Sequence, residues 1–138
     1  MLGKMLQSKN MTILDANAIL RYLIKDIEEQ EGKVNEILNI NSIDLYITTE
    51  TIAEVVYVLK NTYKRNNKTI SAILIKFINI KNVNVFSLKI IIQALLYYSD
   101  EKLDFVDCML ASYKKELGYN IFTFDKKLNS LLATIDSL

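Results

Sequence analysis

Short apolar runs alternate along the sequence with longer segments in which apolar residues recur every three or four positions. The short runs have the length of buried strands, and the longer segments have the period of amphipathic helices. Strands are expected at residues 11–14, 45–48, 83–86 and 120–124. Strands that alternate with helices form a mostly parallel sheet covered by helices on both faces, so the pattern predicts the α/β fold class.

Helical periodicity occupies most of the sequence between these runs. Helices are expected around residues 18–23 and over 27–40, 50–64, 69–80, 88–98 and 104–117, with a last short helix that begins at Asp125. Thr69 or Ser71 is expected to cap the helix at 69–80, and Ser87 to cap the next one. Gly118 stands in the usual position just past a helix and predicts where the helix at 104–117 ends.

The length of 138 residues fits one domain with a sizeable core. Residues 11–138 are expected to form that domain, and residues 1–10 a flexible lead-in or an extension from an upstream start. Cys108 is the only cysteine, which excludes an intrachain disulfide and favours a cytoplasmic location. No apolar run approaches the roughly 18 residues that a membrane span requires, so no membrane partner is expected.

The sequence contains no histidine. Its absence excludes Ser-His and Cys-His nucleophile pairs and the usual zinc sites, so catalysis would depend on carboxylates, Lys, Tyr or a metal. The three glycines are isolated from one another, and a phosphate-binding P-loop is therefore not supported. The formal net charge of +1 gives no strong overall field, so nucleic acid would be bound by local patches.

Five acidic residues stand apart from the charged stretches: Asp15, Glu54, Asp104, Asp107 and Asp125. Asp15 and Asp125 follow two predicted strands, and the carboxyl ends of parallel strands line the ligand crevice of an open α/β sheet. Converging carboxylates repel one another unless a cation compensates them, and Mg²⁺ or Mn²⁺ takes oxygen ligands. Each acid also has a plainer interpretation as a helix cap or a first-turn acid, with Thr51 and Glu54 as a capping box.

Four segments together resemble the signatures of PIN-domain nucleases, in the order of that family. They are residues 14–23 (LDANAILRYL), 51–55 (TIAEV), 103–107 (LDFVD) and 123–127 (TFDKK). The resemblance covers essentially residues 11–131 and is strongest to the VapC-type toxins of toxin-antitoxin pairs. Ala16 departs from the pattern, because many members have Thr there.

The resemblance implies a three-layer α/β/α sandwich with a central, mostly parallel sheet, and a Mg²⁺- or Mn²⁺-dependent endoribonuclease. Asp15, Glu54, Asp107 and Asp125 match the four acidic positions of the family. Asp104 matches a position that is often acidic in the toxins and is treated as an auxiliary metal ligand. Asn17 and Thr123 match polar positions that would orient the neighbouring carboxylates or a metal-bound water.

The expected partners are an RNA substrate, a cognate antitoxin protein and a second copy of the chain. Arg21 and Lys126 are the basic residues that could reach the RNA backbone. The antitoxin and the homodimer are implied by the resemblance to VapC-type toxins. An apolar helix face gives the dimer some further support from the sequence itself; it consists of Ile90, Ile91, Ala94 and Leu95.

Two other functions are compatible with parts of this pattern. A PIN-like domain without catalysis would serve as a binding or scaffold module, although the complete acidic set argues against it. A receiver-like signalling domain also binds Mg²⁺ with acids at strand ends. Resemblance to receivers would call for an adjacent acidic pair after the first strand, but Asp15 is followed by Ala16 and Asn17.

Overall fold

The computed structural model describes residues 11–29 and 43–136, and the predicted lead-in at 1–10 lies outside these ranges. The described chain contains three strands, which are β1 (Thr12–Ile13), β2 (Leu45–Tyr46) and β3 (Val83–Asn84). It also contains six helices, which are α2 (Ala16–Glu29), α4 (Thr49–Asn61), α5 (Asn67–Ile78), α6 (Leu88–Asp100), α7 (Phe105–Leu117) and α8 (Lys126–Asp136). No helix within the described ranges is both long and apolar enough to cross a membrane.

The three strands form one parallel sheet in the order β1-β2-β3. Leu14 donates its backbone N–H to Tyr46 at 3.2 Å, and Ile47 donates to Asn84 at 2.9 Å. These bonds extend the pairing by one residue at the carboxyl ends of β1 and β2. The α/β class with a parallel sheet is therefore confirmed, although each strand is shorter than its apolar run.

Most helix boundaries agree with the local sequence signals. The side chain of Ser87 caps α6 by accepting the Ile90 N–H at 3.3 Å, as predicted. The cap of α5 was predicted wrongly, because Asn66 accepts the Thr69 N–H at 2.8 Å. Asn is among the strongest capping residues, and Thr69 itself supplies the donor. The helix predicted at 27–40 falls partly in α2, which ends at Glu29, and its remainder lies outside the described residues.

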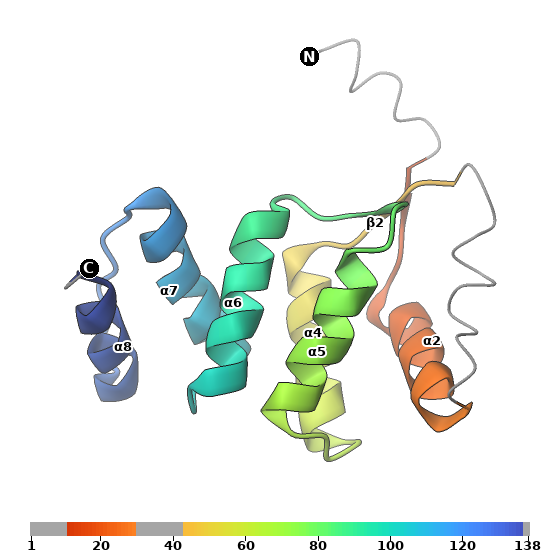
Figure 1. Ribbon diagram of the computed structural model, residues 1–138, viewed down its shortest axis with the longest axis horizontal. Coiled ribbons are helices and arrows are strands. Elements are labelled where there is room, and N and C mark those ends of the chain that lie inside the picture. The colour runs from red at the N-terminus through yellow and green to blue at the C-terminus, as the bar shows by residue number, and fades with distance from the viewer. Residues whose placement is uncertain (1–10, 30–42, 137–138) are drawn as a thin grey trace, which may run out of the picture.

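The predicted strand at 120–124 is wrong. These residues connect α7 to α8 without regular structure and pair with no strand among the described residues. In Figure 1, α6 and α7 separate α8 from the sheet and α2. Phe122 and Phe124 are 86% and 89% exposed, with their ring centroids 5.2 Å apart. The run is apolar enough for a strand, but the helices before it lead it away from the sheet.

The core is centred on α6, which packs between α5 and α7. Two buried serines tie these helices together: Ser71 donates to the Leu95 carbonyl at 2.7 Å and Ser112 to the Ile90 carbonyl at 2.6 Å. The prediction that an apolar face of α6 supports a dimer interface is wrong. All four of its residues, Ile90, Ile91, Ala94 and Leu95, are buried within the chain.

Gly118 ends α7 with a left-handed backbone, as its position in the sequence predicts. Its φ is 73°, and a Cβ built there would meet nothing within 4 Å. The cost of a side chain is therefore backbone strain alone, and Gly118→Ala should lower the free energy of unfolding by about 1 kcal/mol. Chemical denaturation measures this loss. Gly118→Asn should lose less than the Ala variant, because Asn tolerates the left-handed region.

Candidate functional site

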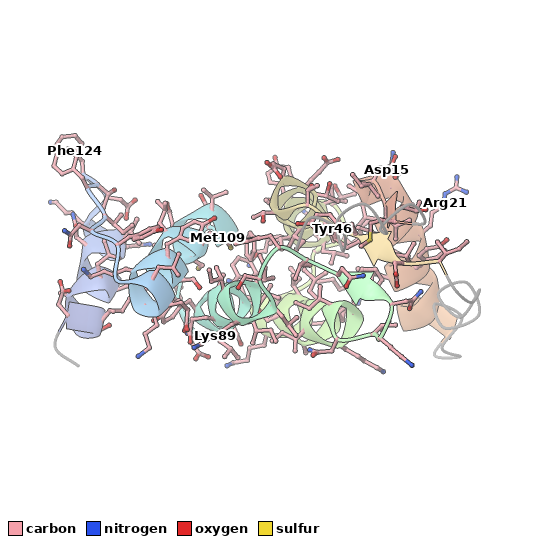
Figure 2. The ribbon with its side chains drawn as sticks, turned by 90° about the horizontal axis from the view of Figure 1, so that it is seen from above. Asp15, Arg21, Tyr46, Lys89, Met109 and Phe124 are labelled. Atoms are coloured by element: carbon pink, nitrogen blue, oxygen red, sulfur yellow. The ribbon has the colours of Figure 1, made fainter. Side chains whose placement is uncertain are left out.

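Asp15 lies directly after β1 and caps α2. Its Oδ1 accepts the Ala18 N–H at 2.8 Å, which confirms the capping interpretation for one carboxylate oxygen. The side chain remains exposed, so the other oxygen faces solvent. Asn17 is exposed in the first turn of α2, and Arg21 follows on the same helix and is also exposed (Figure 2).

Glu54 is not part of a capping box. The cap of α4 is Thr48, whose Oγ1 accepts the Thr51 N–H at 3.2 Å, so Thr51 is already inside the helix. Glu54 lies in the second turn, beyond reach of the helix start, and is exposed. It forms no hydrogen bond or ion pair with any described residue. The structure therefore excludes the helix-capping role that the sequence suggested for Glu54.

Asp104 and Asp107 lie at the start of α7. Asp104 occupies the cap position with an extended backbone, but its side chain makes no capping hydrogen bond. Burial raises the pKa of Asp107 above its ordinary value, and the negative charges of Asp125 and Asp104 raise it further. Among the described residues, neither carboxylate has a hydrogen-bond or ion-pair partner. Both groups are therefore available to a cation.

Asp125 caps α8 and is held by its own loop. Its Oδ1 accepts the Leu128 N–H at 2.8 Å, and its backbone N–H donates to Thr123 Oγ1 at 3.1 Å. Asn129 in turn donates its side-chain amide to the Thr123 carbonyl at 2.9 Å. Thr123 thus fixes the backbone that carries Asp125. Lys126 follows as the first residue of α8 and is exposed.

The structure brings some of the acids together and leaves others apart. Asp107 is near enough to Asp104 and Asp125 for their charges to raise its pKa. Asp15 lies toward the opposite end of the molecule from Phe124, which directly precedes Asp125 (Figure 2). Within residues 11–29 and 43–136, no three His, Cys, Asp or Glu side chains converge on one metal position. The carboxylate donors fit a hard cation, but their arrangement here does not form a complete metal site.

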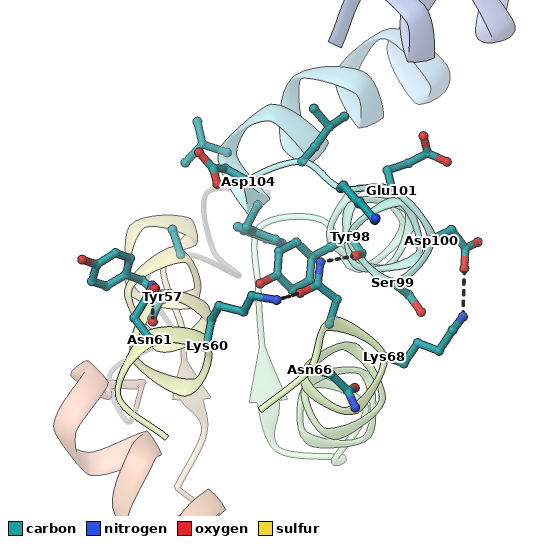
Figure 3. A pocket seen from close by; sticks show the side chains of 16 residues that line it. Tyr57, Lys60, Asn61, Asn66, Lys68, Tyr98, Ser99, Asp100, Glu101 and Asp104 are labelled. Carbon is teal, nitrogen blue, oxygen red and sulfur yellow. Dashed lines mark hydrogen bonds and ion pairs between the residues drawn. The ribbon is translucent and has the colours of Figure 1, made fainter. Parts of the chain in front are cut away.

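A pocket adjoins Asp104, and the sequence did not indicate it (Figure 3). It has a volume of about 950 Å³ and lies between α4, the start of α5 and the connection from α6 to α7. Lys60 donates to Asn67 Oδ1 at 2.6 Å, and the Asn67 amide donates to the Tyr98 carbonyl at 3.0 Å. The available signal was the row of polar and aromatic residues, Tyr57, Lys60 and Asn61, on the side of α4 opposite its apolar stripe.

Tyr98 lines this pocket with most of its ring buried, and its titration predicts an alkaline loss of stability. Burial raises the pKa of Tyr98 to about 12 from 10.0. Its phenol therefore ionises in the unfolded chain first, and the stability present below pH 10 is lost progressively toward pH 12. Tyr98→Phe should lose less stability over this range, as measured by urea unfolding at several pH values. Equal losses in both proteins would contradict the assignment.

Comparison with known proteins identifies the class. Residues 12–131 match the PIN domain, and the chain belongs to this family. PIN domains are typically nucleases and generally depend on a metal. A more particular similarity is to the VapC ribonuclease of Aquifex aeolicus (strain VF5), which is 27% identical over 124 residues. That alignment covers 88% of this chain and 92% of the relative. No solved structure gives a significant match.

Proposed function

We propose that the protein is a Mg²⁺- or Mn²⁺-dependent endoribonuclease. The observation that carries the proposal is the pair of carboxylates at the start of α7. Asp104 occupies a cap position without capping, and Asp107 lies half-buried beside it with no partner among the described residues. Two neighbouring acids without hydrogen-bond partners repel each other, and a bound cation would compensate that repulsion. The family match and the VapC relative support the choice of RNA cleavage.

In this proposal Asp15, Glu54, Asp107 and Asp125 would hold the metal, with Asp104 as an auxiliary ligand, and metal binding would require these acids to come closer together than they lie in the described structure. When bound, the ion would supply Lewis acidity toward a phosphate oxygen and would activate a water. Thr123 positions Asp125 through the backbone bond at 3.1 Å, and Asn17 has the corresponding place beside Asp15. Arg21 and Lys126, both exposed, would contact the RNA backbone.

The proposed biological role is that of a toxin in the cytoplasm, paired with an antitoxin protein and assembled as a homodimer. The support is the similarity to a VapC ribonuclease across most of both chains. The buried free thiol of Cys108 agrees with a reducing compartment. The face of α6 supplies no support for the dimer, since it is occupied by the core.

The test is cleavage of long structured and unstructured RNAs by the purified chain in Mn²⁺, in Mg²⁺ and in EDTA. Cleavage is expected in either metal and should stop in EDTA. Internal cuts, seen as discrete fragments on a denaturing gel, distinguish an endonuclease from trimming at the ends. Cutting that persists unchanged in EDTA would refute the metal-dependent mechanism.

A non-catalytic PIN-like binding module is the second candidate. The observation that favours it is the separation of the acids, because Asp15 and Asp125 do not meet in the described structure. Binding of Mn²⁺ without cleavage of any RNA in the same assay would support this candidate over the nuclease.

A further inference from the structure

We propose that the pocket beside Asp104 binds a nucleotide of single-stranded RNA, with a base stacked on Tyr57 and a phosphate bound by Lys60. This inference rests on the proposed function, since it assigns the RNA a path next to the acidic residues. The pocket volume of about 950 Å³ falls within the range of small-ligand sites and leaves room for a nucleotide with its flanking phosphates.

The pocket is continuous with the candidate site along two elements. Asp104 is part of its lining, and Ala53, which immediately precedes Glu54, is another part. Tyr57 lies three residues after Glu54, and residues at this spacing share one face of a helix. A strand whose phosphate lies at Asp104 or Glu54 would therefore have the pocket directly beside it.

The side chain of Tyr57 is exposed enough to stack on a ligand. Its side chain is 66% exposed although it lines a pocket, and no described aromatic ring packs against it. Val106, which is 58% exposed, lines the same pocket from α7. An exposed aromatic face in a pocket that also has an exposed apolar side chain suits an unpaired base, which stacks on aromatic surfaces whatever its identity.

Three lysines and three carboxylates line the pocket, so its overall charge is balanced and phosphate binding depends on how individual lysines are held. Of the three lysines that line it, Lys68 forms an ion pair with Asp100 at 3.5 Å. Lys60 and Lys102 have no carboxylate partner in the described part of the chain. Lys60 is held instead by the neutral amide of Asn67 at 2.6 Å, so its position is fixed while its charge is not neutralised. A phosphate can form a charge-assisted hydrogen bond with an ammonium group whose position is already fixed.

The amide side chains favour a nucleotide over an acidic peptide. Asn61 and Asn67 line the pocket, and each already donates one amide hydrogen to a backbone carbonyl. The amide oxygen of Asn61 has no partner among the described residues and can accept a hydrogen bond from a base edge. Glu101 and Asp104 repel any anion in the pocket, and an acidic peptide has no flat ring to stack on Tyr57 and offset this repulsion, whereas a nucleotide has one. Because a nucleotide uses Tyr57 for stacking and Lys60 for its phosphate, RNA is the occupant that fits best.

The experiment measures RNA binding separately from cleavage. Fluorescence anisotropy follows a labelled single-stranded RNA bound by the full chain carrying Asp107→Asn in Mg²⁺, a background in which no cleavage is expected. Adding Tyr57→Ala should weaken binding by about 5- to 150-fold, the range that loss of one stacked base produces. Adding Lys60→Ala should weaken binding and reduce the slope of log affinity against log salt by about 1.

Matched controls come from the same chain. Tyr119 is 59% exposed and lies outside the pocket, and Lys76 is an exposed lysine of α5 that is also outside it. Tyr119→Ala and Lys76→Ala should bind as the parent does. Tyr57→Phe keeps the ring and should retain affinity, which separates stacking from damage to α4.

Each result either supports or overturns the inference. Affinities of the Tyr57→Ala and Lys60→Ala variants equal to the parent would overturn it, as would an equal loss in the controls or no RNA binding by the parent. A pocket that serves a protein partner would give the first of these results. Cleavage by the wild type together with unaffected binding refutes the pocket alone. Absence of cleavage together with weakened binding in the two variants supports the pocket and refutes the proposed activity.

Discussion

Asp107→Asn is expected to reduce RNA cleavage more than about 100-fold. The variant replaces a proposed metal ligand by a neutral amide of the same shape, and the loss of groups that merely orient ligands already costs about 10- to 100-fold. Cleavage rates in Mn²⁺ under single-turnover conditions measure the effect. Full activity of the variant, which lacks this negative charge, would show that the Asp107 carboxylate does not hold the metal.

The same variant is expected to be at least as stable as the wild type. Burial raises the pKa of Asp107, and Asp125 and Asp104 raise it further, so the folded state disfavours its charge. The stability that the protonated acid contributes is complete below its ordinary pKa of 3.8 and is lost as the pH rises through the raised value. The advantage of Asp107→Asn over the wild type should therefore grow as the pH increases from about 4. Thermal unfolding across this range measures it.

Asp44→Asn is the matched control. Asp44 is an exposed acid just before β2, at the amino end of the strand, whereas Asp15 and Glu54 come after the carboxyl ends of β1 and β2. The substitution makes the same chemical change and should leave cleavage unaltered. A similar loss of activity in both variants would indicate a general effect of charge on RNA binding, not a specific role of Asp107.

Local signals explain why so many elements were predictable from the sequence. Ser87 caps α6 through its own side chain, and Gly118 ends α7 through its own backbone freedom. Each signal acts within one turn of the helix it limits, so the sequence nearby contains the whole cause. The same is true of β1 and β3, whose apolar residues are flanked by polar ones.

The segment at 120–124 was not predictable by the same means. Its composition suits a strand, but a strand exists only where a partner lies within hydrogen-bonding distance. That partner depends on where α6, α7 and α8 pack, which is decided by contacts distant in sequence. Phe122 and Phe124 therefore remain exposed, and Asp125 follows a loop in place of a strand.

In the candidate site, too, the features set by neighbouring residues were predictable and those set by distant residues were not. The sequence identified Asp15 and Asp125 as possible caps, and the bonds to Ala18 and Leu128 at 2.8 Å confirm this local role. It could not reveal that Thr48 caps α4 and leaves Glu54 unused, because three threonines, Thr48, Thr49 and Thr51, stand close together at the start of that helix. The pocket was harder still to predict from the sequence, because Asp104 and Lys60 line it from segments far apart in the chain.

Leu95→Ala is expected to cause the largest loss of stability. Leu95 is completely buried on α6, between α5 and α7, and its carbonyl accepts the hydroxyl of Ser71 at 2.7 Å. Truncation of a buried leucine removes its apolar burial and leaves a cavity, which together cost about 2–5 kcal/mol. Urea unfolding followed by circular dichroism measures the change in the free energy of unfolding.

Leu96→Ala tests whether this loss comes from burial in the core. Leu96 is the next residue of the same helix and is 46% exposed, so the same truncation there should cost less than about 1 kcal/mol. If the face of α6 that contains Leu95 were instead an interface between two copies, its loss of stability would depend on protein concentration. Because that face is already covered by α5 and α7, the loss should be the same in dilute and concentrated samples. A dependence on concentration would place Leu95 at a subunit contact and contradict the packing of α6.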